Sequence, residues 1–229
     1  MAIEFVAKGT FVSSTSGVTL SPPSGYVDGD LFVIFVSSCA ATIATPSGWS
    51  EIYPEVLDAN LGMRPVGIGA FYKIASGTQG NVSIADSGSG TAAIMTAWRN
   101  VSDTDSINAA LGAASPSTST TFTGSIITTT EDSAMVVVVT HVHRDADSTA
   151  NISGWTNASL ASITEGHDQS TNIGNGVGIA FAYGIKATKG SINATTATNY
   201  TTADWAEITF ALKPALATGG GGNFFAFFM

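Results

Sequence analysis

The sequence predicts an all-β protein: a two-sheet antiparallel jelly-roll sandwich of about eight core strands, followed by a C-terminal tail. Two long apolar runs, at residues 31–36 and 135–139, are rich in β-branched or aromatic side chains. The turns and strands that follow the first run occur again, in the same order, after the second run. No long window places apolar residues at the helical spacing i, i+3, i+4 and i+7. These observations favour strands throughout, arranged as two similar halves.

Each apolar run follows an acidic turn. The first comes after Asp28-Gly29-Asp30, and the second comes after Glu131-Asp132. A continuous apolar run bounded by turn signals is typical of a strand that is buried on both faces. We therefore expect residues 28–36 and 131–139 to form matching central strands.

Shorter strands are expected around the first central strand, at residues 3–7, 10–12, 17–20, 49–53, 66–75, 81–84 and 92–99. Pro22 and Pro23 indicate a loop, because proline cannot donate a hydrogen bond within a sheet. In the second half, Ser153-Gly154-Trp155 repeats the turn Ser47-Gly48-Trp49. Residues 177–185 repeat the strand at 66–74, and residues 205–212 repeat the closing strand.

One domain is expected over residues 1–214, with pseudo-repeat halves at about residues 26–101 and 129–214. Residues 55–64 are polar and irregular, and residues 102–121 are expected to form a long connection between the halves because they contain few large apolar side chains. Residues 215–229 are expected to form a glycine-rich linker and a phenylalanine-rich C-terminal anchor.

The composition argues against several partners. Only 11% of the 229 residues are charged, the net charge is −9, and the eight basic residues are scattered. Such a chain has no basic cluster that could neutralise a row of phosphates, so we expect no nucleic acid and no anionic membrane as partner. The first ten residues lack the pattern of a secretory signal peptide. Cys39 is the only cysteine and is expected to be a buried thiol.

The sequence contains two kinds of candidate metal ligand. His141 and His143 lie two apart in a predicted strand and therefore share one face. They are the best candidate metal site together with Asp145, Asp147, His167 and Asp168. Three acidic pairs offer carboxylates to calcium: Asp28 with Asp30, Asp103 with Asp105, and Asp145 with Asp147. None of these spacings matches a standard metal motif, so we expect neither metal nor cofactor.

The sequence also gives no catalytic set. Glycoside hydrolysis requires two carboxylates that face each other across a cleft. The sequence offers Glu51, Glu131, Glu165 and Glu207, but nothing in it indicates that any two of them face each other. No Gly-x-Ser-x-Gly elbow is found, so a serine hydrolase is not indicated either. The four tryptophans, Trp49, Trp98, Trp155 and Trp205, fit either a sugar-stacking platform or core positions in the repeated strands. We expect core or core-edge positions for the tryptophans, and no enzyme activity.

Five segments resemble those of jelly-roll structural proteins of tailed bacteriophages. They are Gly29-Asp30-Leu31-Phe32-Val33, Ser47-Gly48-Trp49, Tyr72-Lys73-Ile74-Ala75, Ala97-Trp98-Arg99-Asn100-Val101 and Phe210-Ala211-Leu212-Lys213-Pro214. The likeness extends over nearly the whole chain up to Pro214, and its motifs are structural. It implies a capsid decoration or cement protein, a head fibre, a tail fibre or a baseplate-associated adhesin, commonly trimeric and without shared catalytic residues.

We therefore expect a non-enzymatic virion protein that is assembled in the host cytoplasm, forms an oligomer such as a homotrimer, and docks to neighbouring virion proteins. The expected partner-binding residues are those of the tail: Phe224, Phe225, Phe227, Phe228 and Met229. Burying one phenylalanine contributes about 1.5–3 kcal/mol, so four together favour attachment. The alternative is a carbohydrate-binding adhesin module that contacts host surface glycans through exposed tryptophans.

Overall fold

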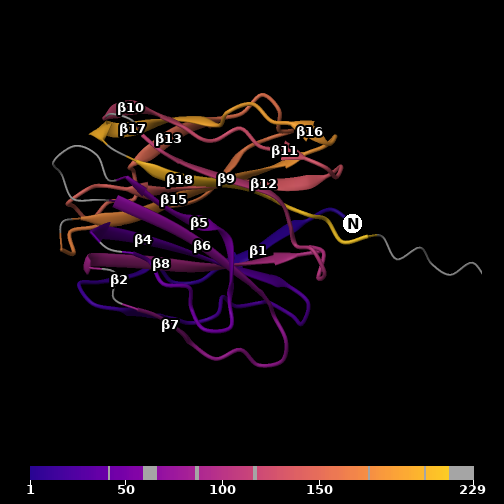
Figure 1. Cartoon of the computed structure of the whole chain (residues 1–229), viewed down its shortest axis with the longest axis horizontal. Coiled ribbons are helices and arrows are strands. Elements are labelled where there is room, and N and C mark those ends of the chain that lie inside the picture. The colour runs from indigo at the N-terminus through magenta and orange to yellow at the C-terminus, as the bar shows by residue number, and fades with distance from the viewer. Residues whose placement is uncertain are drawn as a thin grey trace, which may run out of the picture.

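The computed structural model describes residues 1–40, 42–58, 66–85, 88–115, 118–174, 176–203 and 205–216. Within these ranges every regular element is a β-strand, and all strand pairs are antiparallel. Two main sheets face each other and form the body of the molecule (Figure 1). The predicted all-β class and the antiparallel two-sheet arrangement are therefore confirmed.

The first main sheet is built from residues in the first part of the chain. Its strand order is β1 (Glu4–Lys8), β8 (Gly88–Arg99), β4 (Leu31–Ala40), β6 (Val66–Ile74) and β5 (Ser50–Asp58), and β2 (Val12–Ser14) also pairs with β8. The second main sheet has the order β14 (Thr164–Thr171), β15 (Val177–Lys186), β12 (Ala134–Val142), β18 (Ala206–Leu212) and β9 (Ile107–Ala114). Each main sheet thus takes its strands from one part of the chain, and these strand orders do not confirm the expected jelly-roll connectivity.

Smaller sheets cover the outer faces of the sandwich (Figure 1). A three-stranded sheet lies over the second main sheet and contains β10 (Ser119–Thr123), β17 (Thr196–Ala203) and β13 (Ile152–Thr156). Two short ribbons complete the fold: β3 (Val18–Leu20) with β7 (Val82–Ile84), and β11 (Thr128–Thr129) with β16 (Gly190–Ser191). Because of these outer layers, the central strands have no solvent-facing side.

The two central strands are buried on both faces, as their apolar runs predicted. In β4, Val33 and Phe35 point into the core between the main sheets, whereas Phe32 and Ile34 join a second cluster under the β3–β7 ribbon. The side chains of β12 alternate in the same way between the central core and the cluster beneath the three-stranded sheet. Alternate residues of a strand point to opposite faces, so a continuous apolar run requires apolar cover on both sides.

Residues 102–121 are not a simple connection, which corrects the prediction. They contain β9, which pairs with β18, and the first part of β10. β9 has the sequence INAALGAA, and its small side chains let β5 approach closely. A Cβ on Gly112 would lie 3.0 Å from Tyr53 Cδ1 and still closer to Val56. The sequence does not predict β9 as a strand, because its small residues fit a narrow space and do not form a large apolar face. The supposedly irregular segment after residue 54 also begins as strand, since β5 extends to Asp58.

Candidate functional site

An open groove runs along one edge of the sandwich, between β1–β2 of the first main sheet and β14 of the second. We call it the edge groove. It consists of two adjoining hollows of about 380 and 510 Å³, which share Phe11, Thr149 and Gln169. The complete lining comprises Lys8, Gly9, Phe11, Ser13, Asp147, Ser148, Thr149 and residues 165–171. Ligand sites in proteins typically have volumes of about 300–1,000 Å³.

The floor of the edge groove is polar because β14 carries polar residues at inward-facing positions. His167, Gln169 and Thr171 lie opposite Phe181, Ile179 and Val177 of β15, respectively. Residues directly opposite in an antiparallel pair point to the same face. The three β15 residues belong to the buried core, so the apolar interior gives way to imidazole, amide and hydroxyl groups at β14.

Contacts across the groove join its two walls at one end. Lys8 Nζ donates a hydrogen bond of 2.7 Å to the Gly166 carbonyl and lies 3.5 Å from His167 Nδ1. The ring of Phe11 packs against the His167 imidazole, with ring centroids 5.4 Å apart. Burial, with a smaller effect of the nearby Lys8 charge, lowers the pKa of His167 to about 4. His167 is therefore neutral at pH 7.

The loop at residues 144–151, which supplies the outer wall, is fixed by a buried carboxylate. Asp168 accepts hydrogen bonds from Asn151 N (2.5 Å), Asn151 Nδ2 (2.6 Å) and Ile152 N (2.9 Å). Arg144 donates to Ser148 Oγ, the Ala150 carbonyl and Asn151 Oδ1. The backbones of Ser148 and Ser170 also form a bridge. Asp147, Ser148 and Thr149 are consequently held in place before any ligand arrives.

At the opposite edge of the sandwich, the described contacts between the two main sheets are largely apolar. There β5 lies against β9, and Val56, Tyr53, Ile107 and Ala110 pack on the central core. The two edges therefore differ in chemistry, although both are made by one edge strand from each main sheet. This contrast makes the edge groove the strongest candidate for a binding site in the described part of the chain.

The residues weighed as metal ligands do not come together. His141 is buried between the main sheets, where its Nδ1 lies 2.5 Å from Ser37 Oγ of β4. His167 and Asp168 belong to β14 and take part in the contacts described above. Among the described residues, no three side chains of His, Cys, Asp or Glu are grouped so as to hold a metal ion.

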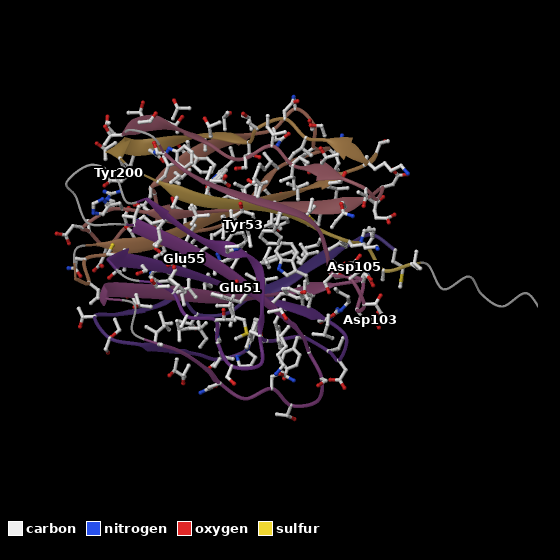
Figure 2. The ribbon with its side chains drawn as sticks, viewed as in Figure 1. Glu51, Tyr53, Glu55, Asp103, Asp105 and Tyr200 are labelled. Carbon is white, nitrogen blue, oxygen red and sulfur yellow. The ribbon has the colours of Figure 1, made fainter. Side chains whose placement is uncertain are left out.

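The acidic pairs are also spread over the molecule and have separate structural partners. Figure 2 shows Asp103 and Asp105 at one end of the sandwich and Tyr200 at the other. Asp105 pairs with Lys213 at 3.2 Å, Asp28 accepts a hydrogen bond from Gly77 N, and Asp147 accepts one from Asn172 N. Asp30 is bound by Arg99, and the Asp145 side chain is exposed.

The four glutamates weighed for catalysis lie on different elements. Glu51 lies on β5 with Glu55 (Figure 2), Glu131 precedes β12 near Lys213, and Glu165 on β14 accepts a hydrogen bond from Trp155 Nε1. Glu207 of β18 is fully buried and accepts hydrogen bonds from Ser125 N, Ser125 Oγ and Thr209 Oγ1. Burial raises the pKa of Glu207 to about 7, although these hydrogen bonds act in the opposite direction.

The tryptophans do not form an exposed platform. Trp98 and Trp205 are buried, whereas Trp49 and Trp155 are partly buried against the outer apolar clusters. The predicted core or core-edge positions are confirmed for all four. Cys39 is buried as well, and its thiol lies 3.2 Å from the Gly176 carbonyl. The tail residues Phe224, Phe225, Phe227, Phe228 and Met229 lie outside the described residues.

Acidification is expected to destabilise the protein through His141. Burial, with a smaller effect of His143, lowers the pKa of His141 to about 3. In the unfolded chain His141 binds a proton as the pH falls below about 6.5, whereas in the folded chain it stays neutral. The free energy of unfolding therefore falls as the pH drops below 6.5. From pH 7 to pH 5 this residue contributes a loss of about 2 kcal/mol.

Urea denaturation at both pH values checks this expectation. His141→Asn should show a pH-dependent loss about 2 kcal/mol smaller than that of the wild type, whatever its absolute stability. His143→Asn, one residue beyond the end of the same strand and partly exposed, is the control. Equal pH dependence in His141→Asn and the wild type would contradict the buried neutral state.

Sequence reasoning missed the edge groove, because β14 (TEGHDQST) has no apolar alternation by which to recognise a strand. A weak signal is the density of residues with hydrogen-bonding side chains at 164–172, next to the strongly apolar segment 177–183.

No helix in the described residues has the length and apolar character needed to cross a membrane. Comparisons of the chain with protein-family models, curated proteins and solved structures find no match.

Proposed function

We propose that this chain is a non-enzymatic structural protein of a tailed-bacteriophage virion, either a capsid decoration or head-fibre protein or a tail-fibre or baseplate component. It assembles as an oligomer, such as a homotrimer, and docks to neighbouring virion proteins. The observation that carries the proposal is the use of the buried acidic side chains. Asp30, Asp168 and Glu207 each hold a loop or turn on the sandwich.

This use of buried carboxylates supports a role as a rigid scaffold. A polar group inside a protein is unfavourable unless it is hydrogen-bonded. Here each acidic side chain accepts at least three hydrogen bonds. The donors to Asp30 are Arg99 and the Val27 amide. The donors to Asp168 are the Asn151 amide and side chain and the Ile152 amide, and those to Glu207 are Ser125 and Thr209. Fixed turns on a packed sandwich suit a protein whose task is to keep its shape within a particle.

The proposed scaffold consists of two similar halves, each forming one main sheet. The turn before each central strand supports this view. Gly29 N and Ser133 N donate to the carbonyls of Ala75 and Ala187, at 2.9 and 3.0 Å, and both donors have positive φ. Asp28 and Asp132 then accept hydrogen bonds from Gly77 N and Lys189 N, both at 2.8 Å.

The strand orders support the same division. The order β1-β8-β4-β6-β5 of the first main sheet matches the order β9-β18-β12-β15-β14 of the second. In each sheet, the strand that comes first along the chain lies beside the strand that comes last, and the central strand, β4 or β12, is the next neighbour. The β3–β7 ribbon likewise parallels the β11–β16 ribbon. The predicted turn at Ser153-Gly154-Trp155 instead lies within β13, at an irregularity in its pairing with β17. Gly154 and Gly48, which lies in the turn before β5, nevertheless both have positive φ, which glycine adopts with little strain.

Deleting residues 219–229 tests the proposed attachment through the tail. We expect the truncated chain to keep its thermal midpoint but to lose assembly, because four phenylalanines in the last seven residues are removed together. Light scattering after size exclusion measures the oligomer, and incorporation into particles measures docking. Replacing residues 219–222 with serine, which keeps the phenylalanines, is the matched control. Normal oligomerisation and incorporation of the truncated chain would show that the tail is not the anchor.

Carbohydrate binding through a tryptophan platform is less well supported. That alternative requires at least two tryptophans exposed on one face, and all four are buried or partly buried. The exposed edge of the sandwich, in contrast, offers a different kind of surface.

A further inference from the structure

We propose that the edge groove binds a saccharide and that Phe11, Thr149 and Gln169 are its main contacts. The proposal does not depend on the virion role, because it rests on the chemistry of the groove alone. A saccharide presents hydroxyl groups that both donate and accept hydrogen bonds, and C–H faces that pack on aromatic rings. The edge groove supplies partners for both kinds of surface.

The polar partners lie along the length of the groove. Within the described residues, the side chains of Thr149 and Gln169 have no hydrogen-bond partner, and both line the two hollows. Asp147 and Glu165 each accept one hydrogen bond through a single carboxylate oxygen, from Asn172 N and Trp155 Nε1. These amide, hydroxyl and carboxylate groups remain available to the hydroxyls of a ligand.

Phe11 provides the apolar contact in the middle of the groove. It lines both hollows, is partly exposed, and rests on the His167 ring. His167 is held below it by packing and by Lys8, so the phenyl ring has a fixed support. An aromatic ring of this kind offers an apolar face of low conformational entropy to the C–H groups of a sugar.

The charges of the groove argue against other ligand classes. Lys8 is the single basic residue of the lining, and Asp147, Asp168 and Glu165 are acidic, so a phosphate-rich ligand is disfavoured. A peptide adding to β14 as an extra strand meets the Ser148–Ser170 bridge and the Lys8 hydrogen bond to Gly166 O, which occupy this edge. A neutral or weakly charged polyhydroxy ligand fits what remains.

Preorganisation of the outer wall favours binding. Asp168, Arg144 and the Ser148–Ser170 bridge fix the loop that carries Thr149 and Asp147. Binding then requires little additional ordering of the protein, which is one of the main costs of association. At the other edge, the described residues Val56 and Tyr53 of β5 lie close to Gly112 of β9, so the polar edge between β1–β2 and β14 is the one suited to binding.

A printed glycan array bearing neutral and sialylated oligosaccharides, probed with the full-length chain, tests the proposal. The oligosaccharide with the strongest signal is then titrated by calorimetry. Phe11→Ala, Gln169→Ala and Thr149→Ala should each raise the dissociation constant, by about tenfold for Phe11→Ala and about threefold or more for the other two. Gln79→Ala, the other glutamine of the chain and remote from the groove, is the matched control and should bind as the wild type does.

Thr149 is exposed and has no hydrogen-bond partner in the described structure, so its variant should fold even if Phe11→Ala is destabilised. The chain lacking residues 219–229 should bind the same oligosaccharide with unchanged affinity, which separates this proposal from the role of the tail. The proposal is overturned if no oligosaccharide binds, or if a bound one is unaffected by both Thr149→Ala and Gln169→Ala.

Discussion

Asp30→Ala is expected to lower the free energy of unfolding by about 1–3 kcal/mol. The Asp30 carboxylate is 2% exposed and accepts hydrogen bonds from Arg99 Nε (3.0 Å), Arg99 Nη2 (2.8 Å) and Val27 N (2.9 Å). Removing it leaves the Val27 amide without its acceptor and the one-third exposed Arg99 guanidinium without its counter-charge. A donor that loses its acceptor costs about 1–3 kcal/mol, whereas the partly solvated Arg99 charge adds little to this loss.

Asp105→Ala provides the matched control, because Asp105 also pairs with a basic side chain but is 68% exposed. Exposed ion pairs contribute about 0–1 kcal/mol, so this variant should remain close to the wild type in urea denaturation. Equal losses in the two variants would mean that burial of the Asp30 carboxylate has no energetic consequence.

Glu207→Gln is expected to stabilise the protein at alkaline pH by about 3 kcal/mol. Burial raises the pKa of Glu207 to about 7, so the folded chain holds a proton between pH 4.5 and pH 7 that the unfolded chain has released. The free energy of unfolding therefore falls as the pH rises through this range, and the whole penalty is present above pH 7. Glutamine has the same shape, cannot ionise, and still accepts the hydrogen bonds from Ser125.

The measurement is urea denaturation of wild type and variant at pH 5 and pH 8.5. The free energy of unfolding of the variant, relative to that of the wild type, should increase as the pH rises, and most of the increase should be reached by pH 8.5. Glu4→Gln, an exposed residue at the start of β1, should show no such gain. If the difference between Glu207→Gln and the wild type is the same at both pH values, Glu207 is not buried in the manner described.

The two pH effects have opposite signs and nearly cancel between pH 4.5 and pH 6.5, so together they leave the stability nearly level in this range and lower on either side of it. His141 destabilises the fold as the pH falls below 6.5, whereas Glu207 destabilises it as the pH rises toward 7. Both groups are buried polar side chains on main-sheet strands, held by hydroxyl groups of serine or threonine. Neither role is visible in the sequence, because the partners Ser37 and Ser125 are far from them along the chain.

The strongly apolar strands were predictable because burial on both faces requires a continuous apolar run. Residues 31–36 and 135–139 carry that run, and both became central strands with apolar cover on each side. The turns before them were predictable for a similar local reason, since Asp28-Gly29-Asp30 contains the glycine that a positive φ favours. Polar or small-residue strands gave no such signal, and β14 and β9 were both missed.

The sequence by itself determined the all-β class, the two central strands and the core or core-edge positions of the tryptophans, because local patterns of apolar residues and turns encode burial directly. Only the tertiary structure decided that β9 closes one edge with alanine and glycine while β14 leaves the other edge open and polar. It also brought Lys8 and Phe11 to His167 and Gln169, which lie in the other main sheet. Such contacts depend on how the two sheets pack against each other. The sequence does not reveal them, because packing brings together residues that are far apart along the chain and share no local pattern.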